Sequence, residues 1–161
     1  GAPHTRRRRA TPSGGAAPAP APKPAPAPAP APAPSPKGQF RAYLTGKFGY
    51  DLGPIMDGTD LSNKLPKGIK DLNRVSVSYV PPSGVNTKSV YFEAYNTRGN
   101  YPDKITRKEN FAPYVIFGDT ANNGYVNGWW TTLPYYFITI SVVGRDAQGK
   151  IIFTDSVDVN K

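Results

Sequence analysis

The chain has 161 residues, and its first 38 residues hold 12 of its 19 prolines and almost no large apolar side chain. This segment cannot build a hydrophobic core, which leaves about 120 residues, the size of one domain. Lysine and arginine total 20 against 11 acidic residues; six of the basic residues lie in the first 38, which leaves 14 against 11 elsewhere. The absence of cysteine excludes disulfides and thiolate chemistry.

The N-terminal arm, residues 1–38, begins with a basic stretch and continues as alternating alanine and proline. Each proline fixes its own φ, lacks an amide donor and restricts the preceding residue to extended geometry, so neither a helix nor a sheet is expected. The arm is therefore predicted to be an extended polyproline II segment that rises about 3.1 Å per residue. A single domain, residues 39–161, follows it.

The domain carries short runs of valine, isoleucine, tyrosine and phenylalanine, separated about every 8 to 12 residues by turn-forming residues, a spacing typical of a β-sandwich. Strands are predicted at 40–44, 75–79, 89–95, 136–143 and 151–159, with a hairpin turn at 146–149. No window shows helical periodicity, so no long helix is expected. Alternation predicts that the following residues face the core: Phe40, Ala42, Leu44, Val75, Val77, Tyr79, Val90, Phe92, Ala94, Ile138, Ile140, Val142, Ile151, Phe153, Val157 and Val159.

From Phe40 onward a series of motifs follows in this order: Asp57–Leu61, Leu65–Pro66, Val90–Phe92, Glu109–Tyr114, Phe117–Asp119 and Asn127–Trp129. This order of motifs resembles the Ig-like and cadherin-like modules of secreted and cell-surface proteins. The arm in turn resembles the Ala-Pro glycomodules of algal and plant wall proteins. Together these resemblances imply an all-β protein: a single Ig-like β-sandwich of about seven strands that serves as a non-catalytic building block outside the cell.

Catalytic chemistry finds little support in the residues. The single histidine, His4, lies in the arm, which excludes Ser-His-Asp, Cys-His and histidine-based zinc chemistry within the domain. A glycosidase with two carboxylates stays open, although Glu93 and Glu109 lie in or beside predicted strands and no phosphate-binding glycine loop occurs. We therefore expect that the protein is not an enzyme and needs no cofactor.

A loop that begins at Asp119 gathers oxygen donors, the ligands that Ca²⁺ prefers. Because it holds one carboxylate, the simpler interpretation is that its asparagines and glycine only form turns. Asp119 and Asn123 are thus a weak calcium candidate, and no metal is expected.

Aromatic residues crowd the same region of the sequence. Exposed rings there could stack on sugars and form a glycan site. The favoured alternative is that Trp129 fills the sandwich core while the others line sheet edges or a contact between subunits. The candidate glycan contacts are Tyr125, Trp129, Trp130, Tyr135 and Tyr136.

The arm carries two further motifs. The cluster Arg6, Arg7, Arg8 and Arg9 could neutralise phosphates, mark a basic cleavage site or dock on an acidic surface. Because the domain adds little positive charge and no nucleic-acid motif, nucleic acid is not the expected partner. The Ala-Pro run is either a plain spacer or a hydroxylated, O-glycosylated segment, and no Asn-X-Ser/Thr sequon occurs. The candidate O-glycosylation positions are Pro26, Pro28, Pro30, Pro32, Pro34, Ser35 and Pro36.

A segment that cannot fold alone, fused to a domain that can, is expected to bind something outside that domain. The leading prediction is a structural subunit of an extracellular filament or surface assembly, a homopolymer in which the arm of one copy packs on the next. Phe40, Ala42 and Leu44 are predicted to add as an edge strand to the neighbour's sheet. The arm residues assigned to this contact are Arg6, Arg7, Arg8, Arg9, Pro18, Pro20, Pro22 and Pro24.

Two alternatives stay open. The protein could be a carbohydrate-binding or adhesion module held away from the cell surface by a proline-rich stalk, or a minor structural protein of a virion. No apolar run reaches the roughly 18 residues that a membrane span requires, so no span is expected.

Overall fold

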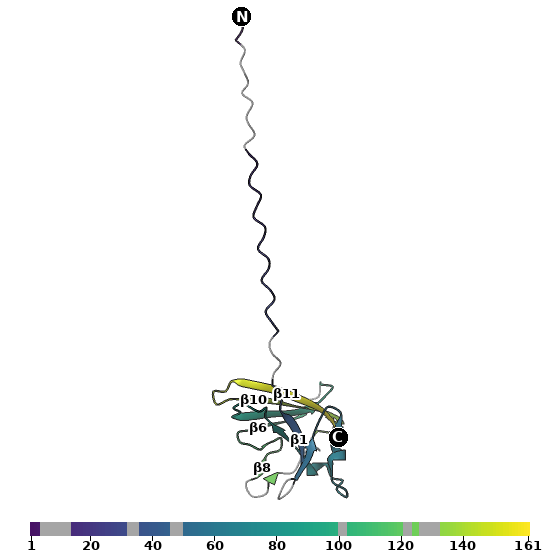
Figure 1. Ribbon diagram of the computed structural model, residues 1–161. Helices are drawn as coiled ribbons and strands as arrows, with labels where there is room; N and C mark the ends of the chain where they lie inside the picture. Colours follow the sequence, from purple (N-terminus) through teal and green to yellow (C-terminus); the bar gives the residue numbers. More distant parts are fainter. Residues whose placement is uncertain (4–13, 32–35, 46–49, 100–102, 121–123, 126–132) are drawn as a thin grey trace. The chain divides into compact units, whose positions relative to one another are not determined.

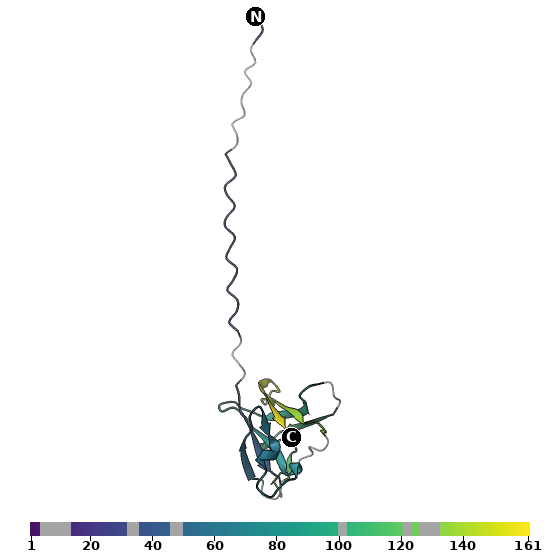
Figure 2. The same cartoon turned by 90° about the vertical axis from the view of Figure 1, so that its right-hand side faces the viewer.

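The computed structural model describes residues 1–3, 14–31, 36–45, 50–99, 103–120, 124–125 and 133–161. The chain divides into two units, Gly1–Pro32 and Ala33–Lys161. In the first unit, residues 14–31 run as an extended chain that belongs to no helix or strand, and all of them are exposed (Figures 1 and 2). The second unit holds the sheets.

The larger sheet of the second unit has five strands in the order β3-β11-β10-β5-β6. All neighbouring strands pair antiparallel except β3, which runs parallel to β11. The long hairpin β10–β11 closes through the predicted turn, where Gly149 takes a φ of 80° and donates its amide to the carbonyl of Asp146. The bounds are β3 (Thr59–Asp60), β5 (Ser89–Asn96), β6 (Lys104–Glu109), β10 (Phe137–Arg145) and β11 (Ile151–Asn160).

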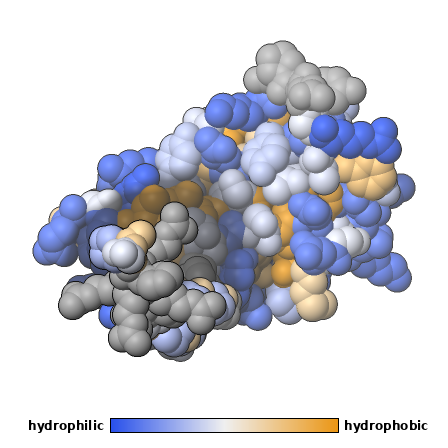
Figure 3. Space-filling model, turned by 90° about the horizontal axis from the view of Figure 1, so that it is seen from above, coloured by the Kyte–Doolittle hydropathy of each residue, from blue (hydrophilic) through white to orange (hydrophobic). Residues whose placement is uncertain are grey.

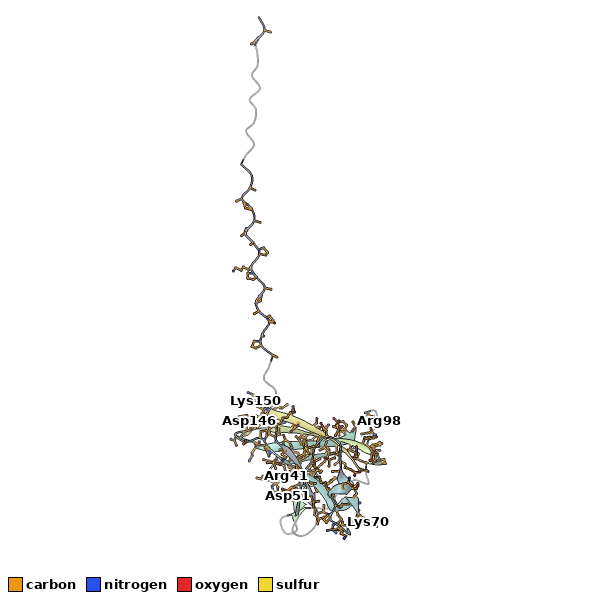
Figure 4. The ribbon with its side chains drawn as sticks, turned by 45° about the vertical axis from the view of Figure 1, so that its right-hand side comes forward. Arg41, Asp51, Lys70, Arg98, Asp146 and Lys150 are labelled. Carbon is orange, nitrogen blue, oxygen red and sulfur yellow. The ribbon has the colours of Figure 1, made fainter. Side chains whose placement is uncertain are left out.

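The second sheet has four antiparallel strands in the order β2-β1-β4-β7. Arg41 of β1 and Asp51 of β2 form an ion pair between these neighbouring strands, with Nη2 and Oδ2 2.8 Å apart (Figure 4). A small separate hairpin is formed by β8 and β9. The bounds are β1 (Gln39–Leu44), β2 (Tyr50–Pro54), β4 (Val75–Val80), β7 (Tyr114–Val115), β8 (Asp119–Thr120) and β9 (Gly124–Tyr125).

Helical structure among the described residues is limited to two 3₁₀ turns, η1 (Leu61–Lys64) and η2 (Leu72–Arg74). Each begins after an aspartate whose side chain accepts a hydrogen bond from a backbone amide of the turn, as N-cap residues do. In the part of the chain that is described, no helix has the length and apolar character needed to cross a membrane.

These elements confirm the all-β sandwich. Seven of the described strands have five residues or more, in agreement with the predicted number. Fifteen of the sixteen residues predicted to face the core are buried, and all of these except Leu44 form one cluster with residues such as Ile55, Leu61, Phe117 and Leu133. When the strands pair in register, their alternate apolar side chains lie on one face of each sheet. The two apolar faces then pack together and form a single core.

Ile151 is the exception, and its predicted burial is wrong because its side chain is 52% exposed. It opens β11 and pairs with Arg145, just beyond a register shift that separates Gly144 from Arg145. Ile151 lies two residues before Phe153, so alternation assigns both side chains to the same face of the strand. Phe153 is 1% exposed, whereas Ile151 lies past the end of the core. Alternation predicts the face of a strand and not how far the opposite sheet extends.

Candidate functional site: the arm and its root

Two residues predicted to belong to the arm, Lys37 and Gly38, contact the sandwich and are called here the root of the arm. The amide of Gly38 donates to the hydroxyl oxygen of Tyr79 at 2.9 Å, and that hydroxyl donates to Oδ2 of Asp155 at 2.9 Å. Nζ of Lys37 lies 3.4 Å from Oδ1 of Asp155. The root is therefore held by side chains from β4 and β11, one strand from each sheet.

The geometry of the root follows from where its partners lie in the core. Tyr79 is 1% exposed, and its ring packs against Phe40 and Phe153, with centroids 4.7 and 5.5 Å away. Asp155 shares the alternation of Phe153 and Val157, so a carboxylate lies on the inner side of β11 at the rim of the core. Burial of a carboxylate costs free energy unless it is paired, and the Tyr79 hydroxyl and Lys37 supply that pairing.

Gly38 could not be replaced here without movement of the chain. A Cβ atom at this position would lie 2.1 Å from the carbonyl oxygen of Val80 and 2.8 Å from the hydroxyl oxygen of Tyr79. Both distances are shorter than any van der Waals contact, and the first involves backbone. The sequence therefore needs glycine where the chain approaches β4.

Burial raises the pKa of the Tyr79 hydroxyl above its ordinary value of 10.0; the Gly38 hydrogen bond opposes this shift, and the nearby Asp155 carboxylate adds to it. In the folded state the Tyr79 hydroxyl therefore keeps its proton at a pH where the same hydroxyl in the unfolded chain has already lost it. The slope of stability against pH is negative wherever the folded state binds more protons. The protein should lose stability as the pH rises beyond about 10.

This predicts that Tyr79→Phe reduces the loss of stability at alkaline pH. Urea denaturation of the unmodified chain and of Tyr79→Phe between about pH 8 and about pH 11 measures this difference, because only the unmodified chain carries a hydroxyl at position 79. Tyr114, whose pKa burial also raises, is present in both forms and provides a common background. Parallel stability profiles for the two forms would show that the Tyr79 proton is not involved.

The structure corrects the role predicted for Phe40, Ala42 and Leu44. Strand β1 is hydrogen-bonded to β2 on one side and to β4 on the other, so it has no free edge. The three side chains are at most 8% exposed and lie in the core of their own domain. They build this sandwich, and the prediction that they extend a neighbour's sheet is wrong.

The remaining residues assigned to the assembly arm fall into two groups. Pro18, Pro20, Pro22 and Pro24 are exposed, as are Pro26, Pro28, Pro30 and Pro36. The cluster of Arg6, Arg7, Arg8 and Arg9 lies outside the described residues, together with Pro32, Pro34 and Ser35. The exposed prolines are accessible both to a partner and to modifying enzymes.

The candidate glycan contacts are described only in part. Tyr135 is half-buried against the core and donates its hydroxyl to Oδ2 of Asp103 at 3.1 Å, whereas Tyr136 is 53% exposed. Trp129 and Trp130 lie outside the described residues, and Tyr125 is described only as backbone of β9. The expectation that Trp129 fills the core stays a prediction.

Sequence reasoning missed the neighbour of Tyr136. Phe137 is 42% exposed, its ring lies edge-on to Tyr136 with centroids 4.8 Å apart, and the guanidinium of Arg98 lies 5.4 Å from its ring centre. Phe137 opens β10, and strict alternation with the buried Ile138 was the signal that could have placed it outside. Two exposed rings and a cation thus form a small aromatic patch.

The two glutamates considered for a glycosidase, Glu93 and Glu109, each form an ion pair. Glu93 lies 3.5 Å from Nζ of Lys104, and Glu109 lies 2.9 Å from Nε of Arg107. Among the described residues, no three histidine, cysteine or acidic side chains gather as metal ligands. The weak calcium candidate falls outside this description, because Asn123 is not described and Asp119 is described only as backbone of β8.

The fold and the root define an all-β sandwich preceded by an exposed proline-rich arm. No family model, no curated protein and no solved structure matches the chain. Any function is therefore inferred from the geometry and chemistry of this molecule.

Proposed function

We propose that the protein is a non-catalytic structural subunit of an extracellular filament or surface assembly, in which the arm of one copy binds the next. The observation that carries this proposal is that every described residue from Gly14 to Ala31 is exposed, while the root that follows is fastened to the sandwich. A fastened root allows a load on the arm to be transmitted to the core of the domain. Within this proposal the sandwich is an Ig-like or cadherin-like module.

The physical chemistry of the arm favours binding in an extended form. Ordering a residue costs about 1 to 2 kcal/mol of backbone entropy, and proline lowers that cost because its φ is already restricted. An Ala-Pro segment can therefore be bound with a smaller entropic loss than a flexible tail of equal length. When the arm and its acceptor are different surfaces of the same chain, the contact is head-to-tail and yields an open polymer.

Deletion of residues 1–32 is the direct test of this function. We expect the shortened protein to stay folded, because the root and the sandwich are intact, and to sediment as a monomer where the full chain forms larger species. Sedimentation velocity and negative-stain microscopy of both forms measure the difference.

A matched variant separates proline from charge. Replacing Arg6, Arg7, Arg8 and Arg9 by alanine keeps the Ala-Pro run, so assembly that depends on the prolines should persist in it. Filaments that survive the deletion of residues 1–32 would contradict the proposed role of the arm, and so would a full chain that is monomeric at every concentration.

A glycan-binding module on a proline-rich stalk is the second candidate, supported by the exposed pair Tyr136 and Phe137 with Arg98 beside it. Aromatic faces of this kind can stack on sugar rings. In this case Tyr136→Ala should reduce binding on a panel of cell-wall polysaccharides, with Ile151→Ala as a control at another apolar side chain of similar exposure. The two candidates differ in oligomeric state, because a tethered module is active as a monomer.

A further inference from the structure

A groove is lined by residues of the four-stranded sheet, in which β4 lies between β1 and β7. Its lining comes from Tyr43 of β1, from β4 and the proline that follows it, and from residues 112–114 at the start of β7. Its volume is about 380 Å³, within the range of about 300 to 1,000 Å³ that ligand sites have. The groove is lined by Tyr43, Ser78, Tyr79, Val80, Pro81, Ala112, Pro113 and Tyr114, and we call it the tyrosine-proline groove.

Two apolar side chains that line the groove or adjoin a lining residue in sequence face water. Val80, which lines the groove, is 47% exposed, and Phe111, which precedes Ala112 in the chain, is 76% exposed. Figure 3 shows more generally that hydrophobic residues reach the surface in patches between hydrophilic ones. Exposed apolar groups that border a hollow are a common mark of a binding surface.

The lining matches one type of ligand in particular. Proline-rich segments in the polyproline II form are recognised by grooves lined with aromatic residues, because the rings pack against the preformed ridges of the segment. Tyrosine, valine and proline make up most of this lining, and no lysine, arginine, aspartate or glutamate takes part in it. Tyr79 and Tyr114 are buried, so the side chains that reach the surface of the groove include the partly exposed ring of Tyr43 and the exposed Val80 and Pro113. The same chain carries an exposed Ala-Pro repeat between Ala17 and Ala31, and a repeat of this kind favours the polyproline II form.

We propose that the tyrosine-proline groove is the acceptor site for the Ala-Pro arm, residues 17–31, of a second copy of the chain. The proposal rests on the proposed function and adds the surface on which the arm of the neighbour lies. Donor and acceptor are then different surfaces of one molecule, as an open head-to-tail polymer requires.

The sequence near the root favours a second copy over the same chain as the source of the arm. Gly38 packs against the carbonyl of Val80, so the root lies at the edge of the groove itself. Strand β1 begins at Gln39 opposite Val80 and runs along β4 beside the groove. For its own repeat to lie on the same stretch of β4, the chain would have to fold back within residues 32–36. Pro32, Pro34 and Pro36 stand in that short stretch, and each disfavours compact geometry in the residue before it.

The test uses the full chain and two variants at the groove. Val80→Lys places a charge in an apolar site at a residue that is already half exposed, and Phe111→Ala removes the exposed ring that precedes the lining residue Ala112 in the chain. Ile151→Lys is the matched control, because it makes the same kind of change at a residue that is 52% exposed and does not line the groove. Circular dichroism and thermal unfolding check that all three variants are folded.

Sedimentation velocity over a range of concentrations gives the strength of association. We expect Val80→Lys to weaken it about tenfold or more and Phe111→Ala to weaken it severalfold, while Ile151→Lys matches the unmodified chain. A synthetic peptide of residues 17–31 should compete with association of the full chain, and the same peptide with glycine in place of each proline should not.

The outcomes separate the two proposals. Association that needs residues 1–32 but is unchanged in Val80→Lys would overturn the groove and leave the proposed function standing. A full chain that never associates would overturn the proposed function. If that monomer binds the peptide only after its own residues 1–32 are removed, the arm occupies the groove of its own chain, and the inference of a second copy is overturned.

Discussion

Phe153→Ala is expected to lower the free energy of unfolding by about 3 to 5 kcal/mol, the usual cost of removing a large buried ring. The side chain is 1% exposed and packs beside Tyr79. It also covers Gly144 of β10 so closely that a Cβ atom at position 144 would lie 2.1 Å from two atoms of the ring. The cavity left by alanine would open between the two sheets, where no side chain from the surface can fill it.

Urea denaturation of the two forms at neutral pH measures this loss. Ile151→Ala is the control on the same strand, because that side chain is 52% exposed and its removal should change stability by about 0.5 kcal/mol or less. Equal losses for the two alanine variants would mean that Phe153 does not bridge the sheets.

Gly144→Ala offers a complementary check on the same contact. Alone it should destabilise the protein by about 1 to 3 kcal/mol, because the added methyl group overpacks the site under the ring. In the Phe153→Ala background the methyl group enters the cavity, so the two changes together should cost less than their sum. Strict additivity would place the two residues out of contact.

Tyr79→Phe is the second large effect, and we expect it to cost about 1 to 3 kcal/mol. The ring is retained, so packing in the core is unchanged. Loss of the hydroxyl leaves the Gly38 amide without its acceptor. Asp155, whose side chain is only 11% exposed, loses the hydrogen bond that the hydroxyl donates to it. When a buried polar group loses its hydrogen-bond partner, it stays away from water without a compensating bond, and this destabilises the folded state.

A double-mutant cycle with Asp155→Ala isolates this contact. Because the two side chains satisfy each other, Tyr79→Phe should cost less in the Asp155→Ala background than in the native chain. Hydrogen exchange at the Gly38 amide should quicken in Tyr79→Phe, since this amide loses the oxygen to which it donates. Unchanged exchange and additive losses would show that the network does not hold the root.

The local pattern of the chain was enough to predict much of the sandwich. Alternation in 75–79 and 89–95 placed Val77 and Phe92 in the core, because a strand that is half buried needs apolar residues at every second position. The turn at 146–149 was predictable for a similar reason, since Asp146 and Gly149 suit a tight hairpin wherever it occurs.

Elements whose residues carry no apolar alternation were missed. Strand β6 reads Lys-Ile-Thr-Arg-Lys-Glu, and most of its side chains are exposed because it lies at the edge of its sheet. Strand β2 contains Gly53 and ends at Pro54, and it also lies at an edge. An edge strand forms because its backbone pairs with a neighbouring strand. Its mostly exposed side chains show little of the apolar alternation from which a strand can be predicted.

The sequence by itself determined the division into a proline-rich arm that cannot build a core and a domain of alternating strands, because backbone restriction and side-chain periodicity are local properties. Only the tertiary structure decided that β1 lies between β2 and β4, that Gly38, Tyr79 and Asp155 meet at the root, and that β1, β4 and β7 line a groove. These arrangements join residues far apart in the chain. They follow from how the two sheets bury a shared core, which no single segment encodes.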